Sequence, residues 1–301
     1  IIIFLIICIQ LILVIITATQ VLHIHTGKPP SLPGCFRGDT ELELQDGTFV
    51  KIENIEAGCI LKNNNTVTST MKLACLNNKM YNLNNVYVTG EHGVFHNNKY
   101  IKVQKHPSSV LDNNNYPFVY CINTDSKKIE INNMVFTDWD DLQNNEIEEI
   151  QEKCGKYLPH AFELQDIHTL LDGGFVKNTK LETLEGHSIN IQDIKVNDVL
   201  RFGETVIGTV KIKADDLTIQ EYKLNDNMKI IGGPNLQLCD IDLGMISTLD
   251  LIGNEKNEKF IYHLLTDKKT LIINGIKFFD YNGCIDKYLD LETKDFIYGS
   301  I

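Results

Sequence analysis

A cysteine at position 35 directly follows a glycine, in the run Gly34-Cys35-Phe36. A thiolate is a good nucleophile, but an ordinary cysteine thiol has a pKa of about 8.5 and is mostly protonated at neutral pH. The carbonyl closest to this thiol is that of Gly34, and attack on it moves the acyl group from nitrogen to sulfur. Because glycine lacks a Cβ, it tolerates the unusual torsions that strain such a bond. The pair is therefore a candidate nucleophile, Cys35, with a scissile bond at Gly34.

The amide nitrogen of Cys35 is a poor leaving group, so the same chemistry needs a proton donor. A histidine that protonates a departing nitrogen contributes about 10²–10⁴-fold in rate. His92 ends the run Thr89-Gly90-Glu91-His92, and we expect it to be this general acid. Thr89, on the same turn, is expected either to orient His92 or to donate a hydrogen bond to the developing oxyanion.

The eight cysteines are scattered, and none forms a CxxC pair or lies beside a spaced pair of histidines. This pattern argues against a zinc site, and in a chain of 301 residues it is not typical of a disulfide framework. We therefore expect no metal and no cofactor, and most of the cysteines to be buried thiols. The cysteines are Cys8, Cys35, Cys59, Cys75, Cys121, Cys154, Cys239 and Cys284.

Length and charge limit the classes of function. A chain of 301 residues suffices for about two ordinary domains. The 28 lysines and arginines are outnumbered by 40 acidic residues, which gives a formal net charge of −12. Nucleic-acid binding needs a basic face, so we expect no nucleic-acid partner.

Residues 1–22 form an apolar run without a charged residue, long enough to cross a bilayer as a helix of about 20 residues. We expect a transmembrane helix and hence a single-pass, membrane-anchored protein whose side of the membrane is undetermined. A signal peptide and a helix buried in an upstream domain are the alternatives. Residues 23–34 then form a stiff linker that is rich in proline and glycine.

The chain contains an internal repeat. Residues 34–61 and 173–200 share nine of 28 positions without a gap, at an offset of 139 residues. Residues 121–140 and 263–282 share seven of 20 positions in the same order. We therefore expect two modules, 35–142 and 173–301, joined by an acidic linker at 143–172 for which a helix is one interpretation.

Both modules have the pattern of short strands. Alternating residues surround Asp46-Gly47, and further hairpin turns are predicted at Asn132-Asn133 and Asn274-Gly275. Residues 85–103 are expected to form another pair of short strands around a turn. Strands at this spacing with polar turns predict an all-β fold of two tandem modules after the N-terminal hydrophobic helix.

Three blocks of the first module resemble the Hint (hedgehog/intein) self-processing domains. Residues 34–61 resemble the opening block, which starts at the self-cleaving cysteine. Residues 89–92 resemble the Thr-x-x-His block, and 119–139 resemble the closing block, in which a strand pair returns to the cysteine. The resemblance covers nearly all of residues 34–142. It implies N-terminal autocatalytic cleavage through a thioester at Gly34-Cys35.

The closing block adds Cys121 to the candidate site. It stands where inteins often carry an aspartate, and it either tunes Cys35, accepts the acyl group, or is simply a small buried residue. Asp138 in the same block recurs as Asp280 in the other module, which lacks the nucleophile. That recurrence indicates a structural role for Asp138, such as capping a turn.

The sequence also departs from the family. Splicing inteins end in His-Asn, whereas the first module ends in Phe136-Thr137-Asp138-Trp139-Asp140, so cleavage without full splicing is expected. Hedgehog proteins pass the thioester to a sterol and use a further lipid-recognition region for this. We recognise no separate region of that kind in the sequence, so we expect water or a small thiol to be the acyl acceptor.

The second module has Gly174 in place of Cys35, and Gly232-Gly233-Pro234-Asn235 in place of the Thr-x-x-His block. It therefore resembles a degenerate copy. The alternative for the whole chain is a catalytically inert, membrane-tethered binding module that keeps this fold.

Overall fold

The computed structural model describes residues 34–76, 78–142, 144–155, 163–164, 166–225, 228–233, 235–239 and 256–290. The apolar run 1–22 and the linker up to residue 33 lie outside the described residues, and with them the predicted membrane helix. Among the residues that are described, no helix is both long and apolar enough to span a membrane. All elements below belong to the compact unit Pro33–Ile301.

The first half of this unit, residues 34–142, consists of short strands with 3₁₀ turns between them. The strands are β1 (Glu41–Glu43), β2 (Phe49–Lys51), β3 (Ile60–Leu61), β4 (Asn65–Ala74), β5 (Met80–Leu83), β6 (Val86–Thr89), β7 (Gly93–His96), β8 (Lys99–Lys102), β9 (Ser109–Asp112), β10 (Phe118–Thr124), β11 (Lys128–Ile131) and β12 (Met134–Thr137). The 3₁₀ turns are η1 (Ile52–Asn54), η2 (Lys62–Asn64) and η3 (Val103–Lys105).

Two helices follow in the predicted linker, α2 (Asn144–Gly155) and α3 (Asp166–Leu171). The second half is again mostly strands and ends in a helix. Its elements are β13 (Phe175–Val176), β14 (Lys180–Glu182), β15 (Ser188–Asn190), η4 (Ile191–Asp193), β16 (Val206–Lys213), β17 (Gln220–Asn225), β18 (Met228–Gly232), β19 (Phe260–Thr266), β20 (Thr270–Ile273), β21 (Ile276–Phe279) and α4 (Tyr281–Asp290). The described fold is therefore mostly β, as the sequence predicts, with three helices among the described residues.

The predicted hairpins form where the turn residues place them. Gly47 has a φ of 82° between β1 and β2, and Asn132 and Asn133 have φ values of 50° and 59° between β11 and β12. Asn274-Gly275 turns in the same way between β20 and β21. In the two turns at Asn132-Asn133 and Asn274-Gly275, positive φ at both central residues matches the right-handed twist of the flanking strands, whereas at Asp46-Gly47 only the glycine has a positive φ.

Residues 85–103 contain the predicted pair of short strands around a turn, β7 and β8, and a further strand, β6, precedes that pair. Strand β6 pairs with β5, whereas β7 pairs with β8 and β12. The tight turn lies at Asn97-Asn98, whose φ values are 49° and 64°. The Thr-x-x-His run is the corner at which the chain leaves one sheet for another, and there the side chains of Thr89 and His92 are buried while Glu91 is exposed.

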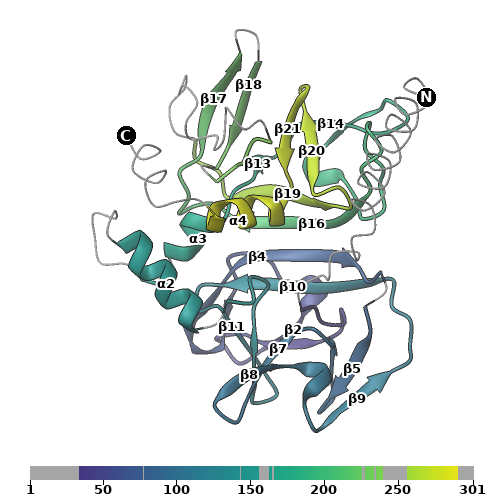
Figure 1. Ribbon diagram of the computed structural model, residues 1–301, viewed down its shortest axis with the longest axis vertical. Coiled ribbons are helices and arrows are strands. Elements are labelled where there is room, and N and C mark those ends of the chain that lie inside the picture. Colours follow the sequence, from purple (N-terminus) through teal and green to yellow (C-terminus); the bar gives the residue numbers. More distant parts are fainter. Residues whose placement is uncertain are drawn as a thin grey trace, which may run out of the picture. The chain divides into compact units, whose positions relative to one another are not determined.

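The two halves share one eight-stranded sheet, in which β10, β4, β16 and β19 are consecutive neighbours (Figure 1). At its centre β4 and β16 run antiparallel, with Met71 opposite Val210. Those two residues are separated by 139 positions, the offset of the sequence repeat. The repeats are therefore related by a pseudo-twofold axis through this pair, as in an isologous dimer. An edge strand of each half is covered by the other half.

Each half surrounds its own hydrophobic core with equivalent residues. The Phe36 and Phe136 rings meet edge to face at 5.2 Å, and Phe175 and Phe278 do the same at 5.3 Å. Further equivalent core pairs are Leu42 and Leu181, Ile52 and Ile191, Ile55 and Ile194, Leu61 and Leu200, Ile129 and Leu271, and Ile131 and Ile273. The apolar positions that the two repeats share thus fill the two cores.

Asp138 and Asp280 make the same buried hydrogen bond in both halves. The Thr124 amide donates to Asp138 Oδ2 at 3.0 Å, and the Thr266 amide donates to Asp280 Oδ2 at 2.9 Å. Each carboxylate thereby fixes the start of a hairpin. The role is structural, as the recurrence of this aspartate in the sequence indicates.

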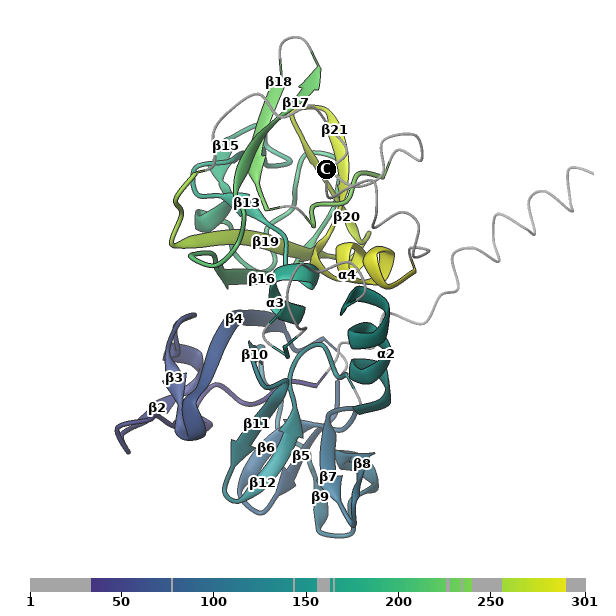
Figure 2. The same ribbon diagram turned by 90° about the vertical axis from the view of Figure 1, so that its left-hand side faces the viewer.

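Polar side chains also connect the halves beside α3 and α4, which contact each other (Figure 2). Asn123 on β10 donates to the Tyr281 hydroxyl at 3.0 Å, and that hydroxyl donates to Asp172. Trp139 Nε1 donates to Asn282 Oδ1 at 3.0 Å. These bonds cross from the first half to α4, so the halves are joined by more than sheet pairing.

Candidate active site

Cys35 lies between two strands at the start of the first half. Its neighbour Phe36 forms bridges to Tyr120 on β10 and to Val88 on β6. Cys35 itself is fully buried. Because the next residue is held on both sides, the backbone of Cys35 has little freedom to move.

Thr89 holds both ends of the Cys35 backbone. The Cys35 amide donates to Thr89 Oγ1 at 2.9 Å, and the Thr89 amide donates to the Cys35 carbonyl at 2.8 Å. The first of these donors is the nitrogen of the Gly34–Cys35 peptide. The structure therefore places the threonine hydroxyl at the nitrogen of the candidate scissile bond, a position different from the two that the sequence suggested.

His92 is buried directly against Gly34. Its Nε2 lies 2.8 Å from the carbonyl oxygen of Thr137, and because a carbonyl only accepts, Nε2 carries the proton. Nδ1 is buried and has no hydrogen-bond partner among the described residues. A Cβ added to Gly34 would lie 2.2 Å from Nδ1. The lone pair of His92 therefore lies beside the residue whose carbonyl would be attacked.

Burial controls the protonation of both candidate groups. It lowers the pKa of His92 to about 4, since the ring is enclosed with Phe36 and Phe136 at centroid distances of 4.5 and 5.6 Å. Burial also raises the pKa of the Cys35 thiol well above its ordinary value. At neutral pH the imidazole is therefore neutral and the thiol protonated. A nucleophilic role for Cys35 therefore requires that its thiol first lose a proton to a base.

Thr137 is a site residue that the sequence reasoning missed. It ends β12, and its hydroxyl donates to Asp141 Oδ1 at 2.8 Å, while Asp141 Oδ2 accepts from Lys102 at 2.7 Å. These bonds fix the carbonyl that sets the tautomer of His92. Every residue has a backbone carbonyl, so a sequence motif cannot identify the one that binds His92. The only available signal was that Thr137 lies in the closing block.

Cys121 lies on β10 and is buried. The antiparallel register pairs Phe36 with Tyr120, so it sets Cys35 opposite Cys121. The structure therefore brings together all the predicted site residues, which are Gly34, Cys35, Thr89, His92 and Cys121. Within the described part of the chain, no group of three His, Cys, Asp or Glu side chains is arranged to hold a metal ion.

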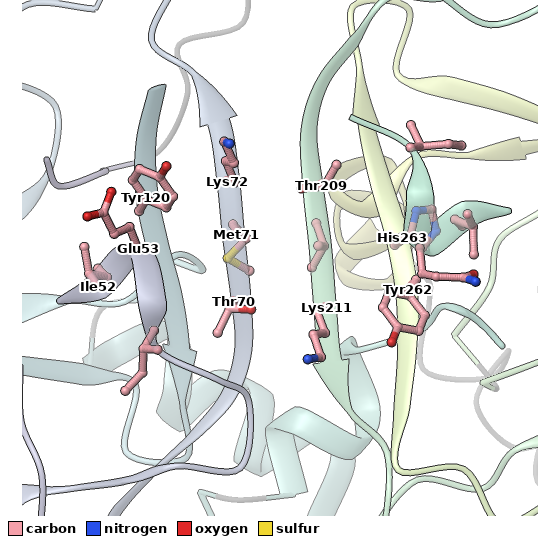
Figure 3. A pocket seen from close by; sticks show the side chains of 15 residues that line it. Ile52, Glu53, Thr70, Met71, Lys72, Tyr120, Thr209, Lys211, Tyr262 and His263 are labelled. Carbon is pink, nitrogen blue, oxygen red and sulfur yellow. The ribbon is translucent and has the colours of Figure 1, made fainter. Parts of the chain in front are cut away.

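A cavity of about 230 Å³ lies on the pseudo-twofold axis, away from these residues. Figure 3 shows equivalent side chains around it, Thr70, Lys72 and Tyr120 from the first half and Thr209, Lys211 and Tyr262 from the second. The two lysines are alike, each 4.2 Å from the centroid of a phenylalanine ring, Phe118 or Phe260. No candidate catalytic residue lines this cavity.

The second half has neither nucleophile nor histidine at the equivalent positions. The Gly233 amide donates to the Gly174 carbonyl at 3.0 Å, just as Thr89 donates to Cys35. Leu238 pairs with Phe278 as Val94 pairs with Phe136.

These contacts correct the alignment drawn from sequence by one residue. Gly233 stands at the place of Thr89, where the sequence alignment put Gly232. By the same count Leu236, rather than Asn235, stands at the place of His92. Sequence comparison missed the shift because glycine occupies both 232 and 233.

Residues 34–141 match the family model Vint, described as a Hint-domain. No curated protein matches the chain. This segment is therefore a Hint domain, of a family that includes autoprocessing domains. The match ends before α2 and does not extend to the second half.

Proposed function

We propose that the Hint domain cleaves its own chain between Gly34 and Cys35 by an N–S acyl shift, without splicing. The observation that carries the proposal is the environment of one peptide bond. Its nitrogen donates to Thr89, and the unpartnered Nδ1 of His92 lies against the glycine on its acyl side. If His92 only filled the core, the chain would not need a glycine at position 34, directly against the imidazole ring.

Each step of the proposed reaction has a defined donor and acceptor. The proton of the Cys35 thiol passes to His92 Nδ1 while sulfur bonds to the Gly34 carbonyl carbon. The carbon–nitrogen bond then breaks, and Nδ1 returns the proton to the departing nitrogen. A thioester and a free amine result. Because burial lowers the pKa of His92 to about 4, its protonated form is a strong acid toward that nitrogen.

The carbonyl of Thr137 and the hydroxyl of Thr89 assist at opposite ends of this transfer. Thr137 accepts from Nε2 and so stabilises the transient imidazolium. Thr89 holds the nitrogen in place as it leaves, through a hydrogen bond with a net value of about 1 kcal/mol. Both groups are positioned before the reaction begins, so the reaction needs little reorganisation.

Hydrolysis or a small thiol would then release the acyl segment. The closing segment carries Thr137-Asp138 and not the His-Asn pair, so no residue is available there for the cyclisation that splicing requires. As part of the proposal, cleavage separates the Hint domain from residues 1–22, for which a membrane anchor with undetermined side remains our expectation.

The proposal is tested with the full chain carrying an N-terminal tag. Intact-mass measurements over several days should show fragments that separate between Gly34 and Cys35, and dithiothreitol or hydroxylamine should accelerate their release. Cys35→Ala should stay intact, whereas Cys59→Ala, a half-buried cysteine away from the site, should cleave like the wild type. An intact wild-type chain in the presence of thiol would refute self-cleavage.

The burial of Cys35 favours a second candidate function, an inert binding module that keeps this fold. A buried thiol with a raised pKa forms little thiolate and reacts slowly. Iodoacetamide labelling distinguishes the two functions. Inertness is supported if Cys35 reacts no faster than Cys75 at pH 7 and the chain stays intact, and it is excluded by fragments that depend on Cys35.

A further inference from the structure

Lys72 and Lys211 are equivalent lysines at the cavity on the pseudo-twofold axis, and they differ in their partners. The ammonium of Lys211 forms an ion pair with Glu56, which lies just after η1 of the first half. At the repeat offset of 139 residues from Glu56 stands Lys195, just after η4 of the second half. The pseudo-twofold relation therefore sets Lys195 beside Lys72. In this second pair a cation has replaced the carboxylate.

Among the described residues, neither Lys72 nor Lys195 forms an ion pair with a carboxylate. Asp198 accepts from the backbone amide of Lys195 at 2.8 Å, not from its ammonium. The ammonium of Lys72 lies 4.2 Å from the centroid of the Phe118 ring, which helps to hold it in place. Both lysines are exposed to solvent. In a chain with a formal net charge of −12, such a pair of uncompensated cations favours an anionic ligand.

Two hydroxyl groups lie next to Lys72 at the same end of the cavity. The strand register sets Tyr120 on β10 opposite Lys72 from one side, and Thr209 on β16 opposite it from the other. Directly opposite residues of antiparallel strands point to the same face of a sheet. Figure 3 shows these side chains around the cavity. The end of the cavity at Lys72 therefore offers ammonium and hydroxyl donors together.

The rest of the cavity is mostly apolar or aromatic. Its volume of about 230 Å³ is below the range of about 300–1,000 Å³ that is typical for drug-sized ligands, so the ligand must be small. Among the described lining residues, the carboxylate is that of Glu53, which Figure 3 shows beside Tyr120. The apolar and aromatic lining residues are Ile52, Ile55, Met71, Ile191, Ile194, Val210 and Tyr262.

We propose that this cavity binds a small phosphate monoester, with the phosphate between Lys72 and Lys195 and the organic group against the apolar lining. A phosphate monoester carries a charge of about −1.5 to −2 at pH 7 and three strong acceptor oxygens. It therefore matches two ammonium groups and two hydroxyl groups better than a carboxylate does. Binding involves no step of the cleavage reaction and goes beyond the proposed function.

The test titrates the full chain with phenyl phosphate in an isothermal calorimeter, in a Cys35→Ala background that keeps the chain intact. We expect saturable binding at one site, and binding should weaken as salt is added because the contact is electrostatic. Inorganic phosphate and phenol each lack one part of the ligand and should bind at least about tenfold more weakly. The absence of saturable binding, or equal affinity for inorganic phosphate, would overturn the proposal.

Single variants test the two lysines. Lys72→Met and Lys195→Met keep an apolar stem and remove the charge, and each should weaken binding by about tenfold, as expected for hydrogen bonds to a charged group. Lys211→Met is the matched control. It removes the equivalent lysine, which Glu56 already neutralises, and should change the affinity by less than about twofold. Equal losses in Lys72→Met and Lys211→Met would contradict the assignment. Glu53→Gln should strengthen binding, because the carboxylate repels the phosphate.

A charge exchange between the two ends of the cavity gives the sharpest result. Lys195→Glu provides Lys72 with the carboxylate that Lys211 has, and it should abolish binding. Adding Glu56→Lys to that variant moves the uncompensated lysine pair to the opposite end of the cavity. Binding should then return and depend on Lys211. Binding that Lys195→Glu leaves unchanged, or that still depends on Lys72 after the exchange, would overturn the proposal.

Discussion

Gly34 and His92 pack so closely that any side chain on the glycine would collide with the imidazole. An added Cβ would lie 2.0 Å from Cγ and 2.2 Å from Nδ1 of His92. The ring cannot easily retreat, because Phe36 and Phe136 enclose it and Thr137 holds its Nε2. The position of the His92 ring therefore depends on the absence of a side chain at residue 34.

Replacing Gly34 with alanine should therefore displace His92. We expect the rate of cleavage to fall by at least about 10²-fold, since misplacement of a reacting group by about 1 Å costs that much. Overpacking should also lower the free energy of unfolding by about 1–3 kcal/mol. Urea unfolding in a Cys35→Ala background measures stability without interference from cleavage. Unchanged cleavage in the Gly34→Ala chain would place His92 outside the reaction.

Thr89→Val keeps the shape of the side chain but leaves the buried Cys35 amide without its acceptor. An unsatisfied buried donor costs about 1–3 kcal/mol, which corresponds to about 10–100-fold in rate if the loss falls on the transition state. Thr89→Ser retains a hydroxyl and should cleave within about tenfold of the wild type. Time courses of the three chains provide the measurement. Equal rates for Val and Ser would show that the hydroxyl has no part in cleavage.

His92→Gln should retain much of the packing and lose the proton transfer. Cleavage should slow by about 10²–10⁴-fold, the usual contribution of general acid–base catalysis. The control is His96→Gln, because His96 lies on β7, contacts His106 at 4.4 Å between ring centroids and takes no part in the proposed reaction. Comparable slowing in both variants would contradict the assignment.

Because of His168, the free energy of unfolding should fall as the pH rises from neutral to alkaline values. Burial alone would lower its pKa, but Asp172 and Asp216 raise it to about 9. A raised pKa means that the folded state holds a proton that the unfolded state releases above pH about 6.5. The stabilisation is complete below that pH and is lost as pH rises toward 9, by up to about 3 kcal/mol. Thermal melts of wild type and His168→Gln from pH 6 to 9.5 should converge at the alkaline end. Parallel curves would be the contrary result.

Tyr281→Phe tests the polar link between the halves. It removes the hydroxyl that accepts from Asn123 and donates to Asp172, and both partners are buried. We expect a loss of about 1–3 kcal/mol in the free energy of unfolding. Tyr222→Phe, a buried tyrosine in the second core outside this network, is the matched control and should lose less. A similar loss in both would mean that the link contributes little.

Local sequence patterns correctly predicted the features that depend on interactions between residues close in the chain, such as tight turns. The turns at Asn132-Asn133 and Asn274-Gly275 were predictable because positive φ at adjacent residues selects asparagine and glycine, and the turn at Asp46-Gly47 because its glycine takes a positive φ. The repeat was visible because both cores need apolar residues at the same spacing. Cys35 and the Thr-x-x-His run were recognisable because the candidate chemistry requires these side-chain types.

Other features depend on backbone groups from distant parts of the chain, which a sequence pattern cannot identify. The pairing of β4 with β16 is made by backbone groups, so its register leaves no signature in residue type. The carbonyl of Thr137 that orients His92 is likewise a backbone atom.

By itself, the sequence determined the fold class, the repeat and the identity of the candidate nucleophile. Tertiary structure alone decided that Thr89 accepts a hydrogen bond from the Cys35 amide, that His92 is neutral, and that Cys121 lies opposite Cys35. The physical reason is that burial and register arise from segments far apart in the chain, and a pKa follows the surroundings that those segments create.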